Sequence, residues 1–257
     1  MDETITTKIE EPIGFLIINR PEAMNALNEK MLLHLEQQFK LLEDNPQIYV
    51  IILTGTGKSF IGGFDITEEL SFTEEEAAEG SARGKLIFNL IEQCEKPVIA
   101  AINGYALGGG LEMALCCDIR ISGDKAKFGL PEVRLGVIPG FGGTQRLPRL
   151  IGEGWAKKLI FTGDTIHANK AQEIGLVEEV YPQAELMDKV ILLAKKICLN
   201  GELAVRNAKK AINFGIRANL KEGLKQESQL FGNCYTSAEQ KTRMKSFLRK
   251  NRRKKHT

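Results

Sequence analysis

Several features that would assign this chain to a common class of protein are missing from its 257 residues. No apolar run reaches the length that crosses a membrane, so we expect neither a transmembrane segment nor a membrane partner. The N-terminus carries two acids, Asp2 and Glu3, where a secretory or transit sequence would be basic, so we expect a cytoplasmic protein. The net charge is only +2, and nothing in the overall charge indicates binding to nucleic acid.

Cysteine and histidine are too few and too scattered to predict a metal or redox centre. The five cysteines are odd in number, and Cys116 and Cys117 are adjacent rather than spaced as in a redox C-x-x-C motif. We interpret all five as reduced thiols, which agrees with a cytoplasmic protein. The three histidines, His34, His167 and His256, form neither a zinc-binding pattern nor a Ser-His-Asp pattern, so we expect no metal site.

Nucleotide-binding motifs are missing as well. The segment Gly55-Thr56-Gly57-Lys58-Ser59 resembles the end of a phosphate-binding loop, but the glycine expected five residues before Gly57 is Ile52. No G-x-G-x-x-G pattern opens a helix. We therefore exclude nucleotide hydrolysis and expect no bound dinucleotide.

The chain does contain enough apolar material for one large domain, or for a domain with a helical appendage. Hydrophobic residues make up 43% and charged residues 26%, as in ordinary globular proteins. A cap at Asn28 and a capping-box pair, Thr73 and Glu76, predict the starts of two helices, the second reaching about Cys94. Short β-branched or apolar runs predict strands at residues 13–19, 49–53, 97–102, 119–122 and 126–129.

The pattern changes after Pro182. From Ala184 onward it is almost wholly helical, with breaks near Gly201, Asn219 and Ser237. Strands followed by helices indicate an α/β core with a helical C-terminal part. We place the division between residues 1–195 and residues 196–257.

The segment that carries the chemistry runs from Lys96 to Arg149. Its glycines 108–110 join a buried strand to a helix, and glycine lets the backbone turn sharply and a ligand approach closely. An N–H at a helix start has no intrahelical partner and favours negative charge, so it can stabilise an oxyanion. The same glycines would also suit a tight turn that serves packing alone. The paired glycines of loop 58–66 leave the same two readings open.

Two acids in this segment are candidates for proton transfer. Glu112 stands among apolar residues at the helix start, where it either compensates the helix dipole or faces a pocket. Glu132 follows Pro131 and, taken alone, reads more readily as a solvated loop acid. Two acids that converge on one apolar pocket can divide the acid and base roles, because their environments separate their pKa values.

Together these segments resemble the crotonase (enoyl-CoA hydratase/isomerase) family. The similarity runs from Asn19 to the region of Phe247, and it is most specific in residues 103–118 and 128–147. It implies an α/β fold, a crotonase-like spiral of ββα units with a C-terminal helical region used in trimer assembly. It further implies an acyl-CoA substrate, self-association as trimer or hexamer, and no cofactor beyond the CoA of the substrate.

The resemblance also implies the site residues. Glu112 and Glu132 would be the catalytic carboxylates, and the backbone N–H groups of Phe64 and Gly109 would form the oxyanion hole. The presence of both acids favours a hydratase that adds water across the 2,3 double bond of a 2-enoyl-CoA. Glu112 would activate the water, and Glu132 would give the α-carbon its proton. The implied substrate- and CoA-binding residues are Ala26, Gly62, Phe64, Asp65, Ile66, Phe247 and Lys250.

Other readings stay open at this point. An isomerase, or a hydratase of branched acyl-CoA, would share the fold. An RNA-binding protein that retains the fold is suggested by the basic run 249–255, but this run lacks interleaved aromatics and reads more readily as a mobile solubilising end. A catalytically inactive scaffold is disfavoured because both acids are present. Phe64 stands where many relatives carry a smaller residue, so we expect its ring to narrow or reshape the pocket.

Overall fold

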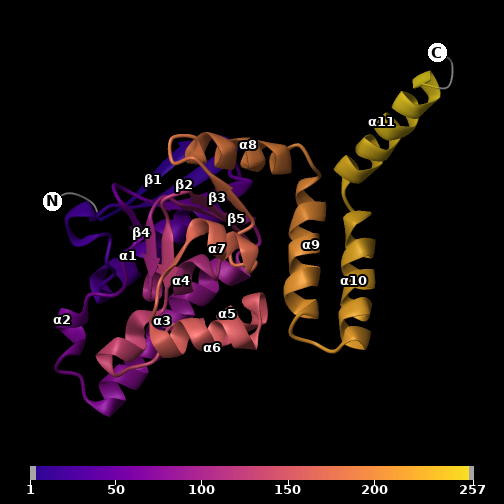
Figure 1. The fold of residues 1–257 in the computed structure, drawn as a ribbon. Coiled ribbons are helices and arrows are strands. Elements are labelled where there is room, and N and C mark those ends of the chain that lie inside the picture. The colour runs from indigo at the N-terminus through magenta and orange to yellow at the C-terminus, as the bar shows by residue number, and fades with distance from the viewer. Residues whose placement is uncertain (1–3, 255–257) are drawn as a thin grey trace.

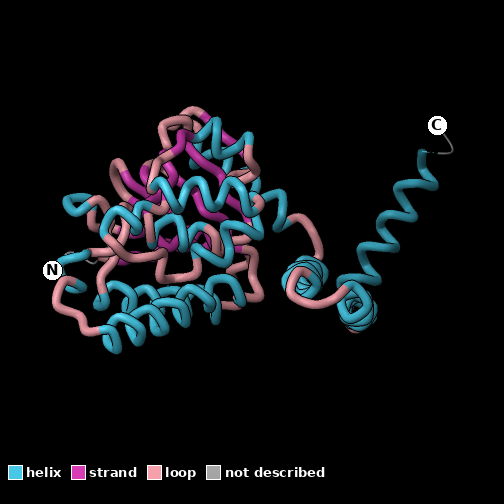
Figure 2. The backbone as a smooth tube through the Cα atoms, turned by 60° about the horizontal axis from the view of Figure 1, so that its bottom comes forward, coloured by secondary structure: helices cyan, strands magenta, loops and turns pink. Residues whose placement is uncertain are grey.

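The computed structural model describes residues 4–254, without the side chains of residues 68, 69 and 250–254. An α/β core forms most of the molecule, and a pair of antiparallel helices stands beside it (Figures 1 and 2). These are α9 (Glu202–Gly215) and α10 (Leu220–Cys234), and α11 (Ala238–Lys254) follows them and points away from the core. The breaks between these helices fall where the sequence predicted them. Most side chains of the basic run 249–255 lie outside the described residues.

The core is built from two sheets that the chain visits in alternation. The larger has the strand order β1-β2-β3-β5-β7-β10, parallel except for β1 against β2, and the smaller has the order β4-β6-β8-β9. After each of β3, β5 and β7 the chain adds a strand to the smaller sheet and then turns into a helix, which gives a ββα repeat. The strands are β1 (Ile5–Glu10), β2 (Ile13–Ile18), β3 (Val50–Gly55), β4 (Ser59–Ile61), β5 (Val98–Ile102), β6 (Tyr105–Leu107), β7 (Ile119–Gly123), β8 (Lys127–Gly129), β9 (Ile166–His167) and β10 (Glu179–Tyr181).

The two long helices of the core begin at the predicted caps. The Asn28 side chain accepts the Met31 N–H before α1 (Glu29–Asp44), and Thr73 and Glu76 form a reciprocal capping box before α3 (Glu74–Gln93). Each cap satisfies backbone N–H groups that have no partner within the helix. The remaining core helices are α2 (Ile66–Glu69), α4 (Gly109–Ala114), α5 (Gly143–Ile151), α6 (Glu153–Thr162), α7 (Ala168–Glu173), α8 (Leu186–Cys198) and the 3-10 helices η1 (Pro21–Ala23) and η2 (Pro131–Leu135).

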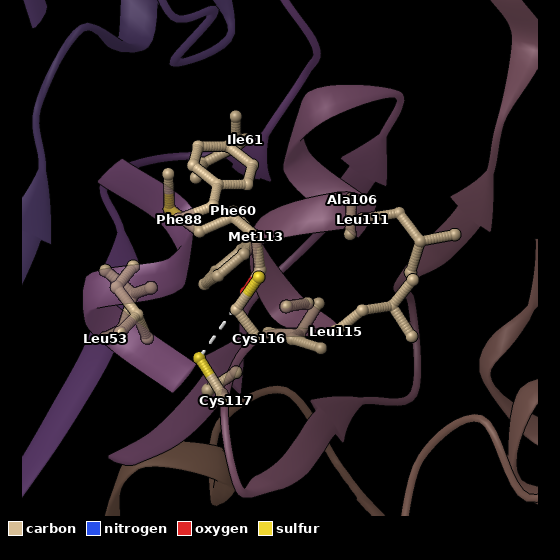
Figure 3. Packing of buried hydrophobic residues seen from close by; sticks show 14 of the residues in the cluster. Leu53, Phe60, Ile61, Phe88, Ala106, Leu111, Met113, Leu115, Cys116 and Cys117 are labelled. Atoms are coloured by element: carbon tan, nitrogen blue, oxygen red, sulfur yellow. Dashed lines mark hydrogen bonds between the residues drawn. The ribbon is translucent and has the colours of Figure 1, made fainter. Parts of the chain in front are cut away.

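The larger sheet is buried on both faces, because alternate residues of its strands point into two different apolar clusters. On one face Leu53 belongs to the cluster that also holds Phe88 of α3 and Met113 of α4, part of which Figure 3 shows. On the other face Ile52 lies in a cluster with Val190 of α8. The helix that carries Glu112 is therefore embedded in the main core.

The attachment of α9 is of another kind. Its buried residues are Asn207 and Lys209, both polar. The Lys209 ammonium donates to Asp118 Oδ2 at 2.7 Å and to the Lys96 carbonyl at 2.9 Å. The predicted division between residues 195 and 196 falls inside α8, and the change from apolar to polar packing comes after Cys198.

Candidate active site

The turn into α4 fits only glycine at two of its three positions. Gly108 has φ of +51°, a backbone conformation that side chains disfavour. A Cβ on Gly110 would lie 2.1 Å from the Ile61 carbonyl oxygen, so the smaller sheet and α4 could not approach as they do. Gly109 is the first residue of α4, and its N–H therefore has no intrahelical partner. Gly109 lines a cavity.

Phe64 lines the same cavity. A single parallel bridge joins it to Leu27: the Leu27 N–H donates to the Gly63 carbonyl at 2.9 Å, and the Asp65 N–H donates to the Leu27 carbonyl at 2.7 Å. In an extended chain, successive peptide groups point in opposite directions. The N–H of Phe64 therefore points away from Leu27 and is not used by this bridge.

Glu112 lies in the first turn of α4 and is only 1% exposed. Its Oε1 accepts two backbone hydrogen bonds, from the N–H of Phe141 at 2.8 Å and from the N–H of Gly143 at 2.7 Å. Burial raises the pKa of Glu112 above its ordinary value, while these two N–H groups and the charge of Arg146 act in the opposite direction. A carboxyl with a raised pKa is a stronger base once it is ionised.

Glu132 reaches the cavity from η2, where Pro131 fixes the start of the helix. Its side chain is half-buried, and its Oε1 would lie 3.0 Å from a Cβ at Gly108. The carboxyl of Glu132 is thus adjacent to the turn into α4. The family resemblance implied that both glutamates act at one site, and both line the same cavity in the structure.

The cavity has a volume of about 1110 Å³, which is large enough for a substantial ligand. Both glutamates and both candidate N–H donors line it. Apolar side chains, among them Leu33, Phe72 and Val137, form much of the rest of its wall. The two glutamates and the two candidate donor residues therefore share a cavity whose wall also contains apolar side chains and the charged residues Glu29, Arg83 and Lys85.

Phe141 is a site residue that the sequence analysis did not single out. Its ring lies 5.4 Å from that of Phe64, which also lines the cavity, and 5.3 Å from that of the buried Phe88, so Phe141 connects the cavity wall to the core. A Cβ on Gly84 of α3 would come within 2.3 Å of the Phe141 ring, and glycine at that position makes room for it. The paired glycines after Phe141 were the available signal, since they resemble the other two glycine loops of the site.

Only some of the other implied binding residues line the cavity. Gly62 and Ile66 line the cavity. Asp65 instead caps α2 and pairs with Arg20 at 3.1 Å, and the same guanidinium donates to the Ala26 carbonyl at 3.2 Å. Asp65 and Ala26 therefore support the Phe64 segment through Arg20.

The two implied CoA contacts of the C-terminal region lie in α11, apart from this cavity. Phe247 is 65% exposed there. Lys250 falls in the same helix, and its side chain is outside the described residues.

Two further properties concern residues 4–254 only. None of the helices in this range combines the length and the apolar character needed to span a membrane. Among the side chains that the structure describes, no group of three or more His, Cys, Asp or Glu is placed to hold a metal ion.

Comparison with known sequences finds relatives along the whole chain. The sequence model of the enoyl-CoA hydratase/isomerase family matches residues 8–256. A crotonyl-CoA hydratase from Syntrophomonas wolfei is 48% identical over 249 residues, which are 96% of this chain and 96% of that protein. A short-chain-enoyl-CoA hydratase from Clostridium acetobutylicum is 45% identical over 242 residues, which are 94% of this chain and 93% of that protein.

Solved structures show the same fold. The crystal structure of an enoyl-CoA hydratase from Bacillus anthracis matches with a TM-score of 0.92 at 40% identity, over 96% of this chain and 97% of the other. An enoyl-CoA hydratase from Thermoplasma volcanium matches with a TM-score of 0.90 at 33% identity, over 95% and 96%. These similarities confirm the crotonase-like α/β fold that the sequence predicted.

Proposed function

Because this chain belongs to the enoyl-CoA hydratase/isomerase family, we propose that it adds water across the 2,3 double bond of a 2-enoyl-CoA to give a 3-hydroxyacyl-CoA. One observation carries this proposal beyond the family name. Two carboxyl groups and two backbone N–H groups that are not used by the fold meet in the same cavity. Hydration needs this set, because negative charge develops on the thioester oxygen, one proton leaves the water that attacks the β-carbon, and another proton is added to the α-carbon.

We assign the oxyanion hole to the N–H groups of Phe64 and Gly109. They would bind the thioester oxygen and draw electron density from the conjugated double bond, which makes the β-carbon electrophilic. The Gly109 N–H also lies at the positive end of α4, although that helix is short. Losing one such donor typically lowers the rate by about 10²–10³.

The two glutamates divide the proton transfers. Both backbone donors bind Oε1 of Glu112, so Oε2 is the oxygen that would orient the attacking water and take its proton. Glu132 would give a proton to the α-carbon as the oxyanion collapses. Water addition changes no oxidation state overall, and we propose that the reaction needs no metal or redox cofactor.

A panel of enoyl-CoA substrates tests the activity directly. We expect loss of the conjugated enoyl absorbance with crotonyl-CoA or a close homologue, in buffer that contains a chelator and no nucleotide. The panel runs from short to long and branched chains, and it includes a 3-enoyl-CoA so that isomerase activity would be seen. If the protein is shown to be folded and yet hydrates none of the 2-enoyl-CoA substrates, the hydratase assignment is wrong.

We also propose that the chain assembles as a trimer or hexamer in the cytoplasm. Helices α9–α11 expose large apolar side chains that a monomer would leave in water, namely Ile212, Phe214, Ile216, Leu220, Leu224, Phe231, Met244, Phe247 and Leu248. A reducing compartment suits the five cysteines, all of which are free thiols. Light scattering at micromolar concentration should give three or six times the monomer mass, and a monomer would contradict the assembly.

A further inference from the structure

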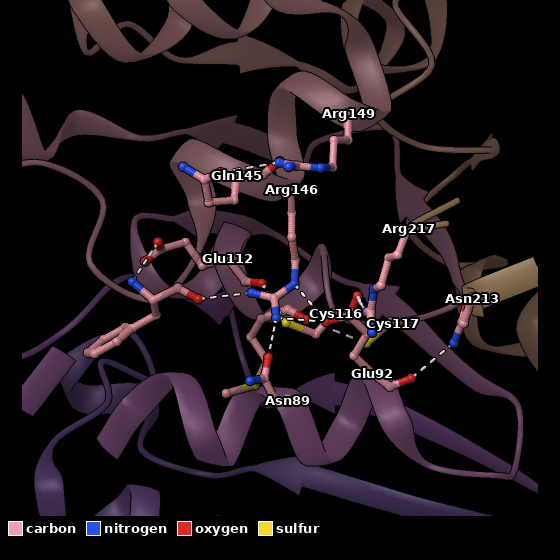
Figure 4. Close-up of polar contacts among 12 residues, drawn as sticks. Asn89, Glu92, Glu112, Cys116, Cys117, Gln145, Arg146, Arg149, Asn213 and Arg217 are labelled. Atoms are coloured by element: carbon pink, nitrogen blue, oxygen red, sulfur yellow. Dashed lines mark hydrogen bonds and ion pairs between the residues drawn. The ribbon is translucent and has the colours of Figure 1, made fainter. Parts of the chain in front are cut away.

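Arg146 of α5 is a largely buried cation to which the mechanism above gives no part. Its side chain is 16% exposed, and every arm of its guanidinium is used. Nε donates to Glu92 Oε2 at 3.0 Å, Nη2 donates to Glu92 Oε2 at 2.7 Å and to Asn89 Oδ1 at 2.6 Å, and Nη1 donates to the Phe141 carbonyl at 3.0 Å. Figure 4 shows this arrangement beside Glu112. Holding a charge so far from water is costly unless its partners are fixed.

The last of these bonds leads to the active site. Phe141 accepts from Arg146 through its carbonyl and donates through its N–H to Glu112 Oε1. Two residues further on, the Gly143 N–H donates to the same oxygen. Gly142, between them, has φ of +112°, and a Cβ there would lie 2.1 Å from Arg146 Nη1. The backbone of loop 141–143 is therefore enclosed between the guanidinium and the carboxylate.

We propose that Arg146 is a positioning residue, which clamps loop 141–143 so that its two N–H groups hold the Glu112 carboxylate in its reactive orientation. The inference rests on the proposed role of Glu112 in hydration. The clamp needs arginine, because one planar fork must reach a carboxylate, an amide and a carbonyl at once, and the ammonium of lysine cannot hold all three in that geometry. Arg146 also acts on Glu112 through its charge, which favours the ionised carboxylate.

The other end of the clamp is anchored to α3 and, through Glu92, to α9 and a residue that follows it. Glu92 and Asn89 belong to α3, and Glu92 also pairs with Arg217, which follows α9. The Asn213 amide of α9 donates to the Glu92 carbonyl at 3.2 Å. Burial raises the pKa of Glu92, but the hydrogen bonds and charges of Arg146 and Arg217 more than offset it, so its pKa lies below the ordinary value. Glu92 therefore stays ionised and holds both arginines at neutral pH.

A set of variants separates this role from a purely structural one. Arg146→Gln should lower kcat for crotonyl-CoA by about 10- to 100-fold with KM nearly unchanged, since small displacements of a reacting group have effects of that size. It should also move the acidic limb of the pH–kcat profile to higher pH, because the pKa of Glu112 loses a lowering charge. Arg146→Lys should restore the limb but only part of kcat.

The matched control is Arg149→Gln. Arg149 lies one turn along the same helix face, is exposed, and donates to Gln145 rather than to the loop. Its variant should keep the wild-type kcat and pH profile. Because Ser81 also ties the loop to α3, with its hydroxyl 2.6 Å from the Gly140 carbonyl, we expect Arg146→Gln to remain folded. If it does not fold, Arg146→Lys and Asn89→Ala carry the same test.

A double variant tests whether Arg146 acts through Glu112. Arg146→Gln added to Glu112→Gln should lower kcat little further, whereas an independent role would multiply the two losses. Either of two results would overturn the clamp. The first is that the kcat losses of the two single variants multiply in the double variant. The second is that Arg146→Gln keeps both the wild-type kcat and the wild-type position of the acidic limb in the pH–kcat profile.

A readout without turnover keeps this inference separate from the proposed activity. In protein with carboxyl-¹³C glutamate, the resonance absent from Glu112→Gln reports the pKa of Glu112. This pKa should rise in Arg146→Gln and stay unchanged in Arg149→Gln. If the wild type hydrates no enoyl-CoA but the resonance shifts as stated, the proposed function fails and the clamp stands. If the enzyme is active and the resonance does not move, the clamp fails alone.

Discussion

Two helices that follow each other in the chain are attached to the core in opposite ways. α8 covers one face of the larger sheet with the apolar residues Leu186, Val190 and Ala194. α9 buries only Asn207, which donates to Asn233 of α10, and Lys209, and ion pairs of Lys209 with Asp118 and of Lys210 with Glu95 hold it to the core. Apolar packing makes α8 part of the fold, whereas charged contacts let α9 be placed accurately without making it part of the hydrophobic core. The candidate catalytic residues belong to the part of the molecule that apolar packing holds together.

The largest expected effect comes from a substitution that removes catalytic activity while α8 and α9 both stay attached to the core. Glu112→Gln should lower kcat for the best enoyl-CoA by about 10²–10⁴, because it keeps the acceptor for the Phe141 and Gly143 N–H groups and removes the base. Steady-state kinetics measure this loss, and light scattering should show the wild-type mass. Near-wild-type turnover would show that Glu112 has another role.

Breaking the apolar attachment is expected to have the next largest effect. Val190→Asp places a charge at a position with no exposure, so unfolding should become easier by about 4 kcal/mol or more. Denaturant titration gives this free energy. Leu192→Asp, on the exposed face of the same helix, is the control, and an equal loss there would mean that burial against the sheet is not the cause.

Breaking the charged attachment is expected to cost less. Lys209→Met leaves Asp118 largely buried without its cation, and we expect a loss of about 3 kcal/mol in denaturant titration. The neighbouring pair of Lys210 with Glu95 is half exposed, so Lys210→Met should cost under about 1 kcal/mol. The double variant Asp118→Asn with Lys209→Met should recover much of the first loss. Equal effects of the two lysines would contradict a special role for the buried pair.

High salt is expected to destabilise α9 relative to α8, with a smaller effect than the substitutions above. At about 1 M salt the exposed pairs of α9 are screened, whereas apolar packing is not weakened. Hydrogen exchange should therefore become faster in α9 relative to α8 as salt rises. Unchanged relative rates would mean that the exposed pairs contribute little to the attachment.

The smallest effect concerns pH and a single carboxyl of the core. The pKa of Glu112 is raised by burial above the unfolded value of about 4.5, so the folded state holds this proton more tightly. That contribution to stability is complete below pH 4.5 and is lost as pH rises through the folded pKa. The melting temperature of Glu112→Gln should therefore increase relative to that of the wild type as pH rises above 4.5. A difference that is constant with pH would contradict the raised pKa.

Local signals in the sequence were sufficient for the elements that carry caps or long apolar patterns. Asn28 and the pair Thr73 and Glu76 located α1 and α3, and the breaks at Gly201, Asn219 and Ser237 separated α8 to α11. β4 and β6 were missed because each is a three-residue strand within a glycine-containing segment that was interpreted as a loop or a turn. The strand β1 was missed because four of its six residues are polar and four are exposed at the sheet edge, so no buried alternation is visible.

The candidate site shows the same limit at the level of side chains. Family resemblance brought Glu112, Glu132, Phe64 and Gly109 together, and the structure places all four around one cavity. Their roles remain predictions until the variants are measured. Arg146 could not be assigned from the sequence, since its partners lie 5, 54 and 57 residues away and no local pattern links them.

The close approach of Gly142 to Arg146 also limits the order in which these positions can be altered by laboratory evolution. A side chain placed first at 142 would collide with the guanidinium and would meet an unfavourable φ as well. Shortening Arg146 first removes the collision but releases the loop that holds Glu112. Each single substitution at Gly142 or Arg146 is therefore harmful, and an alternative loop is accessible only when both residues are replaced together. The segment is thus a poor target for point-mutation libraries and a suitable one for exchange of the whole loop.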